Sequence, residues 1–189
     1  GGPGYAEKDP DTGELNGILR SCTRYLKYQS PSRKPSQEEH AERLKELFRD
    51  YNRVGITGIG ERDADPEEIA LYKYLHDRGE LTVRSYLSQH VDTIQSEEKI
   101  RQAIRGIARS PLYKGGDMLR LGCAKVYMDG GMLTGSAYMR EPWGVSQFYN
   151  ITDPKYRGLR FIPEEKLIAI LETCMENDVQ FNGHSVGDG

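Results

Sequence analysis

Apolar residues recur along the chain at two different spacings. Spacings of three and four residues predict amphipathic helices over about 37–51, 66–78, 96–109 and 163–175. Shorter apolar or alternating runs predict strands at 54–59, 81–88, 121–128 and 179–184. Because helices and strands alternate, the pattern predicts a parallel sheet whose strands are joined by right-handed helical crossovers.

Polar residues mark where two of these helices begin. Ser36 and Glu39 have the spacing of a capping box, in which Ser36 accepts from a first-turn amide and Glu39 reaches back. Asp65 stands before Pro66, and proline is tolerated at the first position of a helix. A short extended piece is expected at 17–19, after a turn.

The last two predicted strands each combine an apolar face with a polar one. Side chains alternate along a strand, so Leu121, Cys123, Lys125 and Tyr127 are expected opposite Ala124, Val126 and Met128. By the same rule, Gln180, Asn182 and His184 are expected opposite Val179 and Phe181. A parallel barrel builds its active site from polar groups at the carboxyl ends of separate strands. Lys125 and His184 are therefore the candidate site residues.

Composition narrows the kind of protein. The 189 residues carry 26 Lys and Arg against 29 Asp and Glu, a net charge of −3, so no basic field exists to attract nucleic acid. No apolar run approaches the length of about 20 residues that crosses a bilayer, and no signal peptide is evident. A cytoplasmic protein with a small-molecule substrate is expected, without membrane or nucleic-acid partners. The three cysteines are widely separated and suggest neither disulfides nor a metal knuckle.

Chain length leaves the architecture open. The pattern contains about four convincing strands, whereas a closed (β/α)8 barrel has eight strands and about 250 residues. Four parallel strands could also form an open doubly wound sheet.

Several segments resemble amidohydrolase family 3. The most specific are Lys-Val-Tyr-Met-Asp-Gly-Gly at 125–131 and Gly-His-Ser-Val-Gly-Asp at 183–188. Supporting segments lie at 9–14, 17–19, 55–57, 141–143 and 156–158. This family comprises metal-dependent hydrolases of the amidohydrolase superfamily, including N-acyl-D-amino-acid deacylase-like and exoenzyme-regulator-like proteins. The resemblance implies an α/β fold that is part of a distorted (β/α)8 TIM barrel. Residues 1–189 would form a single partial domain with about strands two to five.

The same resemblance implies a site for one or two divalent metal ions, with zinc as the expected metal. Lys125 takes the place of the strand-four lysine, and His184 takes that of the strand-five histidine ligand. An ammonium has no lone pair for a cation, so Lys125 is expected to be neutral or carboxylated by carbon dioxide. His184 would bind through a neutral imidazole nitrogen. A metal-activated water would then hydrolyse an amide, a cyclic amide or an N-acyl group.

The segment between Asp129 and Pro163 is rich in aromatic and cationic residues and is expected to cover the site. The candidate substrate-binding residues are Tyr127, Arg140, Trp143 and Arg157. Packing of these side chains on the rim of the barrel is the alternative. No residue is assigned a role in proton transfer.

The sequence also departs from the family. Members carry a His-x-His pair on strand one, a histidine on strand six and an aspartate on strand eight, and none of these is found here. The chain ends five residues after His184. We therefore expect the middle portion of a larger enzyme, which pairs with the rest of the barrel or with further copies of itself.

Two other functions stay open. The segment 183–187 fits G-x-S-x-G, the nucleophile elbow of α/β-hydrolases, in which Ser185 would attack. That function needs an acid and a histidine after the serine, and only Asp188 follows as an ionisable side chain. The chain could instead be a non-catalytic, partner-dependent fragment, with Lys125 a solvated lysine. His90, which follows the third strand, is expected at the rim.

Overall fold

A four-stranded parallel sheet forms the centre of the protein, in a computed structural model that describes residues 4–27, 33 and 35–189. Its strands follow one another in space in the order β3, β4, β5, β6, and each neighbouring pair is parallel. Their bounds are Gly58–Ala64 for β3, Arg84–His90 for β4, Leu119–Tyr127 for β5 and Gln180–His184 for β6. The prediction of parallel strands is therefore confirmed.

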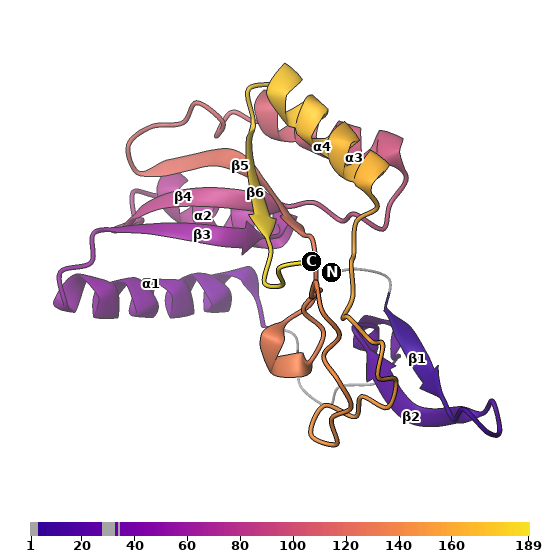
Figure 1. Ribbon diagram of the computed structural model, residues 1–189. Coiled ribbons are helices and arrows are strands. Elements are labelled where there is room, and N and C mark those ends of the chain that lie inside the picture. Colours follow the sequence, from indigo (N-terminus) through magenta and orange to yellow (C-terminus); the bar gives the residue numbers. More distant parts are fainter. Residues whose placement is uncertain (1–3, 28–32, 34) are drawn as a thin grey trace.

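A helix precedes each strand, as the alternating pattern predicts (Figure 1). The helices are α1 (Gln37–Arg53), α2 (Pro66–Asp77), α3 (Glu97–Arg109) and α4 (Glu164–Glu176). The predicted capping box is present, since Glu39 N donates to Ser36 Oγ, and the predicted cap at Asp65 also forms a capping box, in which Glu68 N donates to Asp65 Oδ1. The alternation of helices with parallel strands is that of part of a TIM barrel.

One continuous core joins the helices to one face of the sheet. Phe48 of α1, Leu75 of α2, Ile104 of α3 and Ile170 of α4 are each fully buried in it. Strand residues of the same core are Leu87, Leu119, Leu121, Ala124 and Val126, and Val83 and Val179 join it directly before β4 and β6. All four helices thus contribute to the apolar side, and the opposite face of the sheet is left to polar side chains.

A bulge in β5 changes which residues share the polar face. Leu87 pairs with Leu121, but the next residue, Ser88, pairs with Cys123, so Gly122 is an extra residue in the strand. The extra residue reverses the alternation, and Leu121 lies in the helix-side core. The prediction that Leu121 shares a face with Lys125 is wrong for this reason.

The first sheet strand lies further along the chain than predicted. A strand was expected at 54–59, but the first of these residues belong to the end of α1. The N–H groups of Gly55 and Ile56 still donate to carbonyls of the last helical turn. Gly55 has a positive φ of 83°, and Val54 is 71% exposed. The observed strand β3 is an edge strand ending at Ala64, and it is half-exposed where a buried strand was expected.

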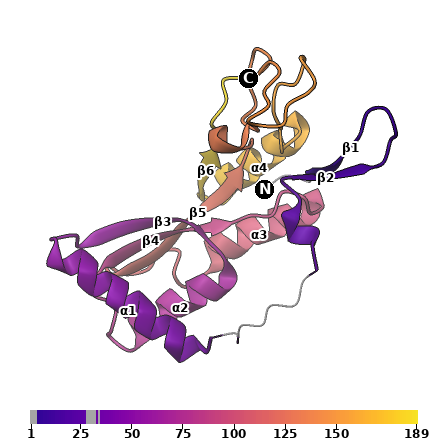
Figure 2. The same ribbon diagram turned by 90° about the horizontal axis from the view of Figure 1, so that it is seen from below.

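Two further segments lie beyond the carboxyl ends of the strands (Figures 1 and 2). The first is an antiparallel hairpin of β1 (Tyr5–Lys8) and β2 (Leu15–Arg20), which includes the extended piece expected at 17–19. The second is the loop at 128–163 between β5 and α4, which contains the short 3-10 helix η2 (Met132–Thr134). None of the helices in the described ranges is both long and apolar enough to cross a lipid bilayer.

Candidate functional site

Lys125 lies on β5 with its side chain on the face that the helices leave open. It is only 6% exposed, and its Cα pairs with His90 on one neighbouring strand and Asn182 on the other. Its Nζ donates to the carbonyl of Val126 at 3.0 Å and lies 3.9 Å from the centre of the Tyr127 ring. Burial lowers the pKa of Lys125, and the charge of Asp63 opposes that shift. Lys125 forms no ion pair with a carboxylate among the described residues.

His184 is the last residue of β6, and its Cα pairs with Tyr127. The imidazole lies 5.0 Å from the Tyr127 ring, measured between ring centres. Tyr127 is therefore in contact with both Lys125 and His184. The two residues that the sequence singled out lie on the same face of the sheet, on neighbouring strands.

A carboxylate and a second histidine complete the cluster. Asp63, near the end of β3, accepts from the Tyr127 hydroxyl at 2.7 Å and contacts His90 Nδ1 at 2.8 Å. Burial, and then the bond to Asp63, raise the pKa of Tyr127 to about 12. The rings of His90 and Tyr127 are 6.1 Å apart. His90 thus lies inside the cluster and is not confined to the rim.

Asp63 is not among the predicted site residues, because the first strand of the sheet lies further along the chain than predicted. With the strand at 54–59, the carboxyl end of that strand falls several residues before Asp63. In β3, the half-buried positions Ile59, Glu61 and Asp63 alternate with exposed ones. Two of these three residues are charged, so the segment has no apolar run that would mark it as a strand.

The donors in this cluster fit part of a metal site. Among the described residues, no three or more His, Cys, Asp or Glu side chains come together closely enough to hold a metal ion. A neutral lysine amine can be carboxylated to give oxygen donors, and a histidine supplies one nitrogen. Lys125 and His184 together fall short of the four ligands of a structural zinc site or the three protein ligands of a catalytic one.

Asp129 ties the end of β5 to the residues that follow His184. Asp129 is 5% exposed, and its carboxylate accepts hydrogen bonds from three backbone N–H groups. These are Tyr138 N at 3.0 Å, Gly187 N at 2.7 Å and Val186 N at 2.9 Å. The two segments that carry the family resemblance are therefore joined by hydrogen bonds as well as by strand pairing.

The three loop residues predicted to bind substrate all make contacts within the protein. Arg140 is exposed, and its backbone N donates to Asp188 Oδ1 at 2.8 Å. Trp143 Nε1 donates to the Ala137 carbonyl at 2.9 Å. Arg157 Nε donates to the Met139 carbonyl at 2.8 Å. Their roles toward a substrate stay a prediction.

Ser185 does not have the surroundings of an esterase nucleophile. A nucleophile elbow is a strained turn in which the N–H after the serine helps to form the oxyanion hole. Here the N–H of Val186 donates to Asp129, and Ser185 is not among the described residues with positive φ. The geometry therefore gives no support to the α/β-hydrolase alternative.

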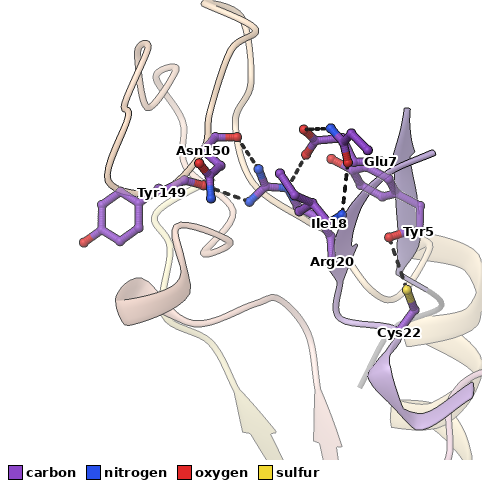
Figure 3. A network of polar contacts seen from close by, with 8 residues as sticks. Tyr5, Glu7, Ile18, Arg20, Cys22, Tyr149 and Asn150 are labelled. Carbon is purple, nitrogen blue, oxygen red and sulfur yellow. Dashed lines mark hydrogen bonds and ion pairs between the residues drawn. The ribbon is translucent and has the colours of Figure 1, made fainter. Parts of the chain in front are cut away.

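Arg20 connects the β1–β2 hairpin to the loop at 128–163 (Figure 3). Its side chain is 9% exposed and forms an ion pair with Glu7 at 2.9 Å. It also donates to the carbonyl of Tyr149 at 3.0 Å and to that of Asn150. One guanidinium thus joins both strands of the hairpin to the loop.

Replacing Arg20 with lysine should loosen this connection without unfolding the core. A lysine has a single nitrogen and cannot reproduce the fork that serves three acceptors. Hydrogen–deuterium exchange should become faster at the Ser146 and Ile151 amides, which bond to each other's carbonyls. Arg49→Lys, at an exposed position of α1, is the matched control. Wild-type exchange rates in the Arg20 variant would contradict the role assigned to this residue.

The fold and site together define a class: part of a (β/α)-barrel domain with ionisable side chains gathered at the carboxyl ends of its strands. The chain belongs to the amidohydrolase family, whose family model matches residues 3–189. The predicted resemblance is confirmed at that level. The finer grouping with N-acyl-D-amino-acid deacylase-like proteins stays a prediction.

Solved structures share the fold. One is an uncharacterized metal-dependent hydrolase from Pyrococcus horikoshii OT3, with 17% sequence identity and a TM-score of 0.63 over 82% of this chain. Another is an uncharacterized metal-dependent hydrolase from Pyrococcus furiosus, with 13% identity and a TM-score of 0.65 over 83% of this chain. The matches cover only 29% and 30% of those two proteins. A comparison with curated proteins gave no match.

Proposed function

We propose that the chain is part of a metal-dependent hydrolase that cleaves a non-peptide carbon–nitrogen bond. The bond would belong to an amide, a cyclic amide or an N-acyl group. The observation that carries this proposal is Lys125: a buried lysine without a carboxylate partner among the described residues, on the same face as His184. Family membership and the fold shared with two metal-dependent hydrolases support it.

The environment of Lys125 favours carboxylation. Burial lowers the pKa of the amine, so a larger fraction is neutral than for a lysine in water. The neutral Nζ lone pair attacks the carbon of carbon dioxide, a C–N bond forms, and one N–H proton leaves to solvent. The product is an anionic carbamate with two oxygen donors, which replaces a cation that would repel a metal ion.

The Lys125 carbamate and the His184 imidazole would hold the metal, for which zinc is the expected identity. A bound zinc ion supplies a water of lowered pKa and polarises the scissile carbonyl. Further ligands would come from polypeptide outside these 189 residues. Asp129 holds the segment after β6 against the loop, which keeps His184 at the end of its strand.

Cationic and aromatic side chains of the loop support a substrate with a carboxylate, such as an N-acyl amino acid. The Arg157 guanidinium lies 5.0 Å from the centre of the Tyr138 ring, and Trp143 stacks edge-on with Tyr149 at 5.5 Å. Arg140 is the most exposed of the predicted substrate-binding cations. In this proposal Arg140 and Arg157 attract the carboxylate, while Trp143 lines the acyl group.

The partner expected from the open face of the sheet is the rest of the barrel. Arg62, Arg84 and Arg120 surround a hollow of about 510 Å³ at the amino ends of the strands. None of the three forms an ion pair with a described residue. In a complete barrel this face would be covered by further strands, so 1–189 is proposed to be a single partial domain.

Metal analysis of the purified natural protein tests the proposal. We expect bound divalent metal, and a carbamate carbon signal in ¹³C NMR after incubation with ¹³C-labelled bicarbonate. Removal of metal with a chelator should abolish hydrolysis of N-acyl amino acids, and added zinc should restore it. A natural protein that binds no divalent metal would refute the assignment and favour a non-catalytic role.

A further inference from the structure

We propose that Asp63 is a positioning residue of this site, which fixes the Tyr127 ring between Lys125 and His184 and fixes the hydrogen position on His90. The inference rests on the proposed function, because the site that it serves is the one proposed above. It goes beyond that function in assigning a role to a strand, β3, that supplies neither of the proposed ligands.

The two oxygens of Asp63 have different partners. Oδ2 accepts from the Tyr127 hydroxyl at 2.7 Å, and Oδ1 lies 2.8 Å from His90 Nδ1. A carboxylate can only accept hydrogen bonds, so the hydrogen of a neutral His90 lies on Nδ1 and its lone pair on Nε2. One side chain thus connects the carboxyl ends of β3, β4 and β5.

Tyr127 transmits this restraint to the two proposed ligands. Its ring centre lies 3.9 Å from Lys125 Nζ and 5.0 Å from the His184 ring centre. A phenol ring whose hydroxyl is held at its far end cannot swing about its Cα–Cβ bond without breaking that hydrogen bond. Asp63 therefore limits where the lysine nitrogen and the imidazole can lie.

The contact between Asp63 and His90 follows a common pattern in metal enzymes. A histidine that presents one nitrogen to a site commonly donates its other N–H to a carboxylate, which fixes the ring and the tautomer. The Cα of His90 pairs with that of Lys125, so their side chains leave the sheet side by side. Asp63 thus keeps the free lone pair of His90 on Nε2.

The experiment is NMR on the metal-free protein in buffer free of carbon dioxide. Imidazole nitrogen shifts report which nitrogen of His90 carries the hydrogen. The chemical shift of the methylene protons next to Lys125 Nζ reports the position of the Tyr127 ring, because protons over an aromatic face are shifted upfield. In Asp63→Ala, we expect loss of the Nδ1-protonated form as the major species and loss of the upfield shift. Asp63 is partly exposed, so the substitution leaves the core intact.

Tyr127→Phe separates the effect of Asp63 on the Tyr127 ring from its effect on His90. It removes only the hydroxyl, so the lysine shift should decrease while His90 keeps its hydrogen on Nδ1. Asp92→Ala is the matched control, because Asp92 lies two residues after His90 and its carboxylate bonds to Ile94 N and Gln95 Nε2, with no hydrogen bond to His90 among the described contacts. The His90 tautomer and the lysine shift in this variant should be those of the wild type.

Two results would overturn the inference: an unchanged His90 tautomer in Asp63→Ala, or an unchanged lysine shift in both Asp63→Ala and Tyr127→Phe. Neither result depends on a metal ion. Failure of the wild-type protein to bind zinc would instead refute the proposed function, so the two failures can be told apart.

Discussion

Replacing Lys125 with methionine is expected to abolish carbamate formation and to lower the affinity for zinc by about 100-fold or more. Loss of a residue that only supports a ligand already costs about 10–100-fold in metal affinity. Methionine has a similar length and no group that carbon dioxide can modify. The measurements are zinc titration with a competing chelator and the ¹³C carbamate signal.

The same substitution should leave the metal-free protein folded. The matched control is Lys99→Met, since Lys99 is exposed on α3 and its Nζ donates only to Gln95 among described residues. Zinc affinity in Lys99→Met should equal that of the wild type. A Lys125→Met protein that binds zinc as tightly as the wild type would exclude Lys125 as a ligand.

Stability should respond to pH in a way that identifies Lys125. Its pKa is lowered in the folded protein, so the unfolded chain binds the proton more tightly. The resulting penalty is fully present at pH values below the lowered pKa. It is relieved as pH rises through the lowered pKa toward the ordinary lysine value. Between these values, the free energy of unfolding of metal-free wild type should rise relative to that of Lys125→Met.

Asp129→Ala is expected to lower the free energy of unfolding by about 3 kcal/mol, because three backbone N–H groups lose a charged acceptor at about 1 kcal/mol or more each. Asp129→Asn keeps one acceptor oxygen and should cost about half as much. Denaturant unfolding measures both values. Hydrogen exchange should also become faster at the amides of Tyr138, Val186 and Gly187, which bond to this carboxylate.

The control for Asp129 is Asp153→Asn. Asp153 is exposed, and its carboxylate accepts only the local N–H of Lys155 among described contacts. Its substitution should change stability by less than about 0.5 kcal/mol. If Asp129→Ala were no more destabilising than this control, Asp129 would not hold the chain after His184 to the loop.

Local sequence signals predicted the helices well. Capping boxes and proline at a first helical position act within a few residues, so Ser36, Asp65 and Pro66 mark helix starts without help from distant contacts. Strand positions were harder to predict. Val54 and Ile56 are apolar, yet the chain uses their neighbourhood to end α1, whereas the real strand β3 is charged and lies at an edge of the sheet.

The sequence by itself determined the alternation of helices with parallel strands, and it determined that Lys125 and His184 stand at the carboxyl ends of two of them. These features depend on periodicity and capping within short segments. Only the tertiary structure decided which side chains meet. The extra residue Gly122 reverses the alternation in β5, and strand pairing brings Asp63 to Tyr127 across 64 positions. Such contacts depend on register between distant strands, which no local pattern encodes.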